Sequence, residues 1–151
     1  MDLLEIKYLI PRVVEWVTVE ERRILDCGMP LDKEQREDAV RLGIENIDGI
    51  RLLISSQTPM TDDPELSEAA ESVGLASQYA TGICFRYGIY IKPGLTDQRR
   101  LLLHELTHTL QYERLGGIEP FLLNYLEECI QVGYPYGPLE REAMESMTLI
   151  K

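Results

Sequence analysis

The stretch that most constrains the fold is residues 101–110, LLLHELTHTL, because it places charged and polar side chains inside a strongly apolar segment. Its leucines fall on several sides of a helix, so we expect a helix that is buried over much of its surface. His104, Glu105 and His108 would then carry a desolvation cost unless something pairs with them. His104 and His108 are the only histidines in the chain. A metal ion with a bound water would satisfy all three side chains at once.

The spacing of these residues is that of an H-E-x-x-H metal site. On a helix, residues four apart lie on one face with their Cβ atoms about 6 Å apart, so His104 and His108 can direct two imidazoles at one ion. Glu105 can reach a water bound to that ion, and zinc lowers the pKa of such a water from about 15.7 to near 7. We therefore predict a Zn²⁺ site with His104 and His108 as ligands and Glu105 as general base.

A catalytic zinc site of this kind needs a third protein ligand. Because no third histidine exists, the H-E-x-x-H-x-x-G-x-x-H type is excluded and the ligand should be a carboxylate further along the chain. Glu128, in NYLEEC, and Glu140, in GPLEREA, are the two candidates. The residues alone leave both open.

The remaining pattern predicts an α+β fold in which a small sheet packs against several helices. Helices are expected from Pro11 to Gly28, from a capping box at Asp32 and Gln35 to Gly43, from Asp63-Pro64 to Gly74, from about Asp97 to Leu115, from Pro120 to Gly133, and from about Leu139 onward. Strands are expected over residues 50–55 and, as a hairpin that turns near Tyr87-Gly88, within residues 81–92.

Three segments together resemble a known family: HELTHTLQYERLGG, FLLNYLEEC and GYPYGPLEREA. With the later E-x-x-A of Glu140 to Ala143, they are similar to gluzincin zinc metallopeptidases, and more narrowly to small bacterial metallopeptidase-like proteins of the size of minimal gluzincins. The narrow resemblance covers roughly residues 80–145. It implies that Glu140 is the third zinc ligand.

The same resemblance implies a zincin-like fold, with the small sheet against the active-site helix and additional N- and C-terminal helices. We expect a single domain over residues 1–151, with a helical part at 1–45 and the metal-site core at 80–148. One departure is notable: many relatives place Asp directly after the Ala of E-x-x-A, where it supports a ligand histidine, and this chain has Met144.

The residues around the site suggest how a substrate would be held. In zincins the strand before the motif helix, here residues 88–92, is commonly an edge strand that can pair with an extended peptide. An ordinary core strand is the alternative, and the sequence leaves both open. Tyr90 in that strand, together with Tyr134 and Tyr136, is a candidate for substrate contact. Tyr112, Tyr134 and Tyr136 are candidates to donate a hydrogen bond to the oxyanion of the reaction.

The composition of the chain argues against a nucleic-acid-binding, membrane-spanning or secreted protein. A net charge of −11 argues against nucleic-acid and anionic-membrane partners, which need clustered Lys and Arg. No segment has the length of a membrane span, and the N-terminus lacks the positive charge of a signal peptide. Cys27, Cys84 and Cys129 match no disulfide or metal pattern, which favours reduced thiols and a cytoplasmic location.

These features predict a zinc-dependent metallopeptidase that acts on a peptide or protein substrate. The alternative is a zinc-binding regulatory or interaction domain with little or no turnover. Because Met144 leaves the support of the ligand histidine incomplete, the expected activity is weak.

Overall fold

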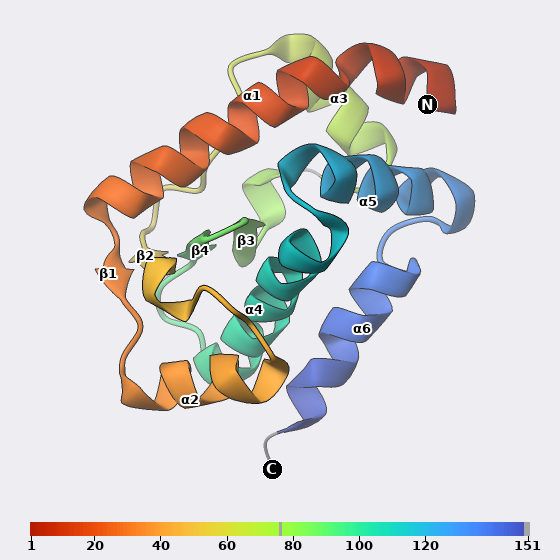
Figure 1. Ribbon diagram of the computed structural model, residues 1–151. Coiled ribbons are helices and arrows are strands. Elements are labelled where there is room, and N and C mark those ends of the chain that lie inside the picture. The colour runs from red at the N-terminus through yellow and green to blue at the C-terminus, as the bar shows by residue number, and fades with distance from the viewer. Residues whose placement is uncertain (76, 150–151) are drawn as a thin grey trace.

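The computed structural model describes residues 1–75 and 77–149 and has an α+β fold (Figure 1). Over these residues a small mixed sheet is surrounded by helices, as the sequence predicts. The helices are α1 (Leu3–Cys27), α2 (Lys33–Leu42), α3 (Pro64–Ser72), α4 (Gln98–Leu115), α5 (Ile118–Val132) and α6 (Pro138–Ser146). The strands are β1 (Met29–Pro30), β2 (Arg51–Ile54), β3 (Gly82–Phe85) and β4 (Gly88–Ile91).

The strand order in the sheet is β1-β2-β4-β3, with β2 parallel to β4 and the other pairs antiparallel. The sequence left residues 88–92 open as an edge strand or a core strand, and the structure shows a core strand, because β4 lies between β2 and β3. All of its residues are buried, which suits an apolar segment that is covered on both faces. The free edge next to the metal-site helix is β3.

Helices cover both faces of β4. Ile89 and Ile91 pack in a cluster with Leu102 and Leu106 of α4, whereas Tyr90 points the other way, into a cluster with Ile24 of α1. This alternation follows from the two-residue period of a strand. Figure 1 shows α1 and α4 on opposite sides of the sheet. This packing fixes the position of α4 relative to the sheet.

The first helix begins earlier than predicted. α1 starts at Leu3, after an N-cap in which the Asp2 side chain accepts a hydrogen bond from the backbone N–H of Glu5, so Pro11 lies inside the helix. A proline inside a helix removes one backbone hydrogen bond. The burial of Ile6, Leu9 and Ile10 in the first turns offsets that loss.

Local signals predicted the other elements well. The Asp32–Gln35 capping box is formed at the start of α2, and Asp63 caps α3 with Pro64 in its first turn. The hairpin forms with Arg86 and Tyr87 in its turn. Its Arg86 has a φ of 65°, and the turn is held by Glu21 of α1, which accepts hydrogen bonds from the Arg86 guanidinium and the Tyr87 backbone N–H.

Candidate metal centre

The helix α4 carries the two histidines and the glutamate of the H-E-x-x-H segment. It is α-helical through this segment, and it ends where the sequence predicts, at Gly116, which adopts a left-handed φ of 102°. His104 and His108 therefore lie on one face, with their ring centroids 5.1 Å apart. His108 is buried and His104 is partly exposed.

Glu140, in the first turn of α6, completes the cluster. Its Oε2 lies 3.1 Å from His104 Nε2, and its Oε1 lies 2.8 Å from His108 Nε2. One nitrogen of each histidine and one carboxylate oxygen all lie within 4.8 Å of one another. Zinc binds nitrogen and oxygen ligands at about 2.0–2.2 Å, so one ion fits between donors at this spacing. Of the two candidates for the third ligand, the structure places Glu140 at the histidines.

Glu128 has a different place. Its Oε1 accepts a hydrogen bond of 2.8 Å from the backbone N–H of Leu139, in the first turn of α6. That N–H is one of the donors that a helix leaves unpaired at its N-terminus. Glu128 thus fixes the start of the helix that carries Glu140.

The charge state of Glu140 follows from its neighbours. Burial raises the pKa of its carboxyl, but hydrogen bonds with His104 and His108 outweigh that effect and hold the pKa well below its usual range. The hydroxyl of Tyr125 in α5 donates a further hydrogen bond of 2.7 Å to Oε1. Glu140 is therefore an anion, the state that a metal ligand requires.

His108 receives its support from Gln111. The Nδ1 of His108 lies 2.8 Å from Gln111 Oε1, while the Gln111 amide donates to the Leu139 carbonyl and to Glu142 Oε1. Glu142 in turn accepts two hydrogen bonds from Arg114. A ligand histidine needs such a partner to fix its ring and tautomer. Met144, the residue after Ala143, is half exposed and takes no part in this network.

Sequence reasoning missed Tyr125 and Gln111. Gln111 is in the turn after His108 on the same helix, at the i+3 position, so helical spacing could have indicated it. Tyr125 could not have been chosen in this way, because the chain holds eight tyrosines and its contact with Glu140 joins two different helices.

Glu105 is set apart from the three candidate ligands. Its side chain is 5% exposed, and among the described residues no hydrogen bond to its carboxylate is formed. Burial raises the pKa of this carboxyl, while the nearby His108 and His104 oppose the shift. The carboxylate lines the cavity described below, where a water molecule can offset the cost of its burial. A metal-bound water is one such molecule, and the donor set therefore fits zinc.

The edge strand β3 passes directly over Glu105. A Cβ atom at Gly82 would lie 3.1 Å from Glu105 Oε2. The absence of a side chain at this point lets the strand and the carboxylate approach each other.

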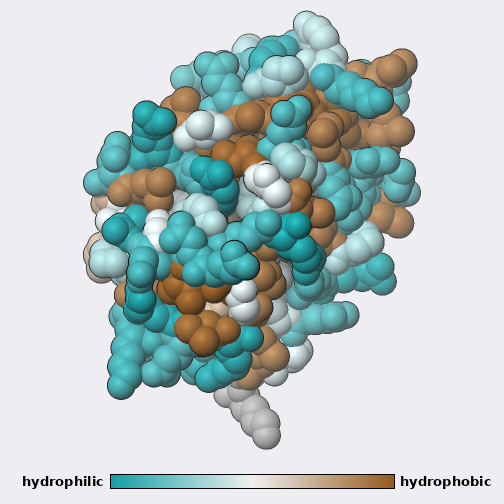
Figure 2. All heavy atoms as spheres, viewed as in Figure 1, coloured by the Kyte–Doolittle hydropathy of each residue, from teal (hydrophilic) through white to brown (hydrophobic). Residues whose placement is uncertain are grey.

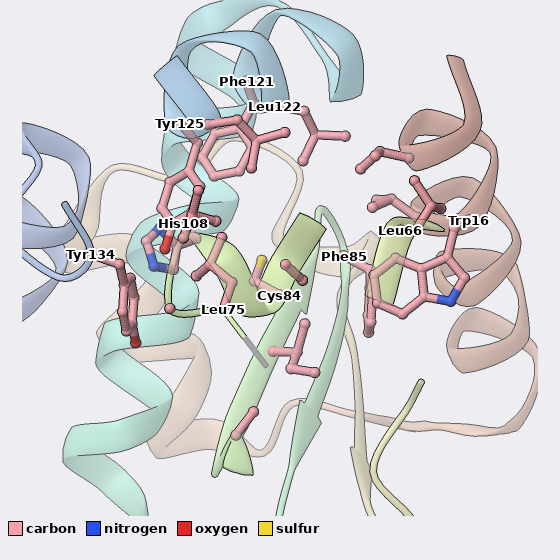
Figure 3. Close-up of a pocket in the computed structure, with 18 of the residues that line it drawn as sticks. Trp16, Leu66, Leu75, Cys84, Phe85, His108, Phe121, Leu122, Tyr125 and Tyr134 are labelled. Carbon is pink, nitrogen blue, oxygen red and sulfur yellow. The ribbon is translucent and has the colours of Figure 1, made fainter. Parts of the chain in front are cut away.

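All four site residues, His104, Glu105, His108 and Glu140, open onto one cavity of about 350 Å³. Figure 3 shows His108, Tyr125 and Tyr134 at one end of it and Trp16, Leu66 and Phe85 at the other. The cavity therefore continues well beyond the metal centre, into the space under α1 and α3.

The predicted tyrosines differ in their relation to the cavity. Tyr134 lines it, and burial together with the charges of Glu140 and Glu105 raises the pKa of Tyr134 to about 12, so its hydroxyl remains a donor. Tyr112 lines the cavity, but its hydroxyl donates to the Cys84 carbonyl. Tyr136 is exposed and lies outside the lining, and Tyr90 is fully buried with its hydroxyl 3.1 Å from Thr58 Oγ1. Tyr134 is the one that can meet a ligand.

Comparison of the chain with protein families, with curated proteins and with solved structures gives no match. Among the described residues, no helix has both the length and the apolar character needed to cross a membrane. Hydrophilic side chains cover most of the face seen in Figure 2. What the protein does must therefore be argued from the site itself.

Proposed function

We propose that the protein is a zinc-dependent metallopeptidase of the gluzincin type, with a zincin-like fold, that hydrolyses peptide bonds in a peptide or protein substrate. The observation that carries this proposal is the separation of roles at the site. Three side chains converge on one point, while Glu105 is buried beside them and forms no hydrogen bond with any of the described residues. A purely structural zinc site has no need of a free carboxylate.

His104, His108 and Glu140 would hold the ion. When bound, zinc lowers the pKa of a water ligand and polarises a carbonyl oxygen. Glu105 accepts a proton from the attacking water and later delivers it to the leaving amine, a task that suits a carboxyl whose pKa is raised by burial. Tyr134 is placed to donate a hydrogen bond to the oxyanion, because it lines the same cavity and keeps its proton at neutral pH.

An extended substrate can be held along β3. This strand is the edge of the sheet, and all of its residues line the cavity that contains the site. Free backbone groups at a sheet edge can pair with a peptide, which fixes the peptide bond relative to the base. Gly82 keeps the path between β3 and Glu105 clear of side chains.

Replacement of Glu105 by Gln tests the proposal. Gln is nearly isosteric but cannot accept the proton, so the hydrolysis rate should fall on the order of 10²–10⁴-fold. Zinc content should stay near one ion per chain, measured by elemental analysis. The melting temperature should stay the same or rise, because an unpaired buried carboxylate is replaced by a neutral amide.

Glu145→Gln on the exposed side of α6 is the matched control and should leave activity unchanged. If wild-type protein loaded with zinc cleaves no member of a broad peptide library, the peptidase proposal is wrong. A zinc-binding interaction domain would then be the correct description.

A further inference from the structure

The cavity is too long to serve only the metal centre. Its far part is walled by α1, α3 and α5, with Trp16 packed edge-on against Phe85 of β3 at a ring-centroid distance of 5.3 Å. Its volume of about 350 Å³ falls in the range of ligand pockets, about 300–1,000 Å³. A close-packed core of natural proteins leaves no void of this size.

The charged side chains among the described lining residues lie at one end of this cavity. Among the described residues that line it, the Asp, Glu, Lys, Arg and His side chains are those of the metal centre: His104, Glu105, His108 and Glu140. The walls beyond them are apolar and aromatic apart from Thr61. A charged group that entered this part would lose its hydration without meeting a side chain of opposite charge, at a high cost.

The cavity also follows the sheet edge. The four residues of β3 form one wall, and Ala69 and Ala70 of α3 form part of the far wall. A peptide that lies along β3 directs alternate side chains to the two sides of its strand, and one of these would enter the space between β3, α1 and α3. The small alanines leave that space open.

From these three observations we propose that the far part of the cavity is a specificity pocket for a bulky, uncharged apolar side chain of the substrate, next to the bond at the zinc. This inference rests on the proposed function, since it names the substrate class of the same site. Burial of a large apolar side chain contributes about 1.5–3 kcal/mol, which corresponds to a preference of roughly 10-fold or more over glycine.

The first test measures binding alone, without zinc or turnover. N-phenyl-1-naphthylamine, a neutral apolar fluorescent probe, should bind the wild-type chain at one site. N-acetyl-Phe-Leu-amide should displace it at a concentration at least 10-fold lower than N-acetyl-Gly-Gly-amide does. Equal displacement by the two peptides, or none by either, would overturn the pocket assignment.

The second test fills the pocket. Ala70→Phe should weaken probe binding at least 10-fold, whereas Glu71→Phe, on the exposed side of the same helix, should leave it unchanged. Equal binding by both variants overturns the assignment. If Ala70→Phe fails to fold, as shown by its melting curve, the displacement experiment on wild type still decides.

Cleavage separates this inference from the proposed function. With zinc-loaded wild type, peptides that carry Phe or Leu beside the cleaved bond should have kcat/KM values at least 10-fold above those with Gly, and Ala70→Phe should abolish that ratio. Cleavage without this preference overturns the pocket and leaves the peptidase proposal intact. Selective peptide displacement without cleavage of any peptide supports the pocket and overturns the peptidase proposal.

Discussion

Gln111 connects the candidate zinc ligands to the surface of the protein. Its side-chain oxygen meets His108, its amide reaches Leu139 and Glu142, and Glu142 pairs with Arg114. The same glutamine thus orients one ligand and ties α4 to α6, which carries another. This arrangement supplies the hydrogen-bonded partner that a ligand histidine needs, without any contribution from Met144.

Replacement of Gln111 by Ala should therefore weaken zinc binding about 10- to 100-fold, the usual effect of removing the partner of a ligand histidine. Competition with a chromophoric zinc chelator measures the change. Gln131→Ala, at an exposed position of α5, is the control. Unchanged zinc affinity in Gln111→Ala would show that the ring of His108 is fixed by packing alone.

Some of these site residues can be predicted from local sequence spacing, and others depend on contacts between helices. His104, Glu105 and His108 belong to one helix, so their convergence follows from local spacing. Glu140 was one of two open candidates, because the choice depends on how α5 returns the chain to α4. Tyr125 was missed for the same reason. Its role depends on a contact between helices, which no local pattern encodes.

At the scale of elements, Glu113 joins α4 to two loops. Its carboxylate accepts hydrogen bonds from the backbone N–H groups of Glu45 and Asn46, and from the Tyr87 hydroxyl in the hairpin turn. Burial raises the pKa of Glu113, but these hydrogen bonds outweigh it and the net shift is downward. The pKa of Tyr87 is raised to about 12, first by burial and then by Glu113.

This depressed pKa makes Glu113 a source of acid sensitivity. A carboxyl with a lowered folded-state pKa contributes stability that is present above its unfolded pKa, near 4.3, and is lost as the pH falls through the folded value. Glu113→Gln should therefore lower the free energy of unfolding by roughly 1 kcal/mol at pH 7, and the difference from wild type should shrink below about pH 4. Urea unfolding across this pH range measures it, with the exposed Glu119→Gln as control. A difference that grows toward low pH would contradict this account.

Helices could be predicted from the sequence where capping residues mark their ends. The caps at Asp32 and Asp63 and the stop at Gly116 are signals of a few residues, and the structure confirms each. The start of α1 was missed because Pro11 resembles a helix start, whereas packing of the preceding turns extends the helix to Leu3. The order of strands was missed because the pairing of β2 with β4 joins distant segments.

At the scale of the whole molecule, a bound zinc ion would join α4 to α6. Folding and zinc binding should then be coupled, since an unfolded chain does not present the three ligands together. At a zinc concentration 100 times the dissociation constant, the gain in stability is about 2.7 kcal/mol. For a domain of this size, that gain raises the melting temperature by several degrees.

Chelation of zinc should reverse this increase in the wild-type protein, as measured by differential scanning calorimetry. Glu140→Ala should lose the zinc-dependent increase, because one ligand is gone. Glu128→Ala should be less stable at any zinc concentration, because Leu139 loses its hydrogen-bond acceptor, yet it should keep the increase. The opposite pattern would make Glu128 the ligand.

The close approach of β3 to α4 also restricts how the chain can evolve. Glycine at position 82 and glutamate at position 105 occupy adjoining space, and a Cβ on the strand would press on the carboxylate at 3.1 Å. A side chain at position 82 therefore requires the Glu105 carboxylate to move, whereas a smaller residue at position 105 leaves Gly82 undisturbed. Among descendants of this protein, a side chain at position 82 should therefore be commoner where Glu105 has been replaced by a smaller residue, so the two positions are expected to vary together.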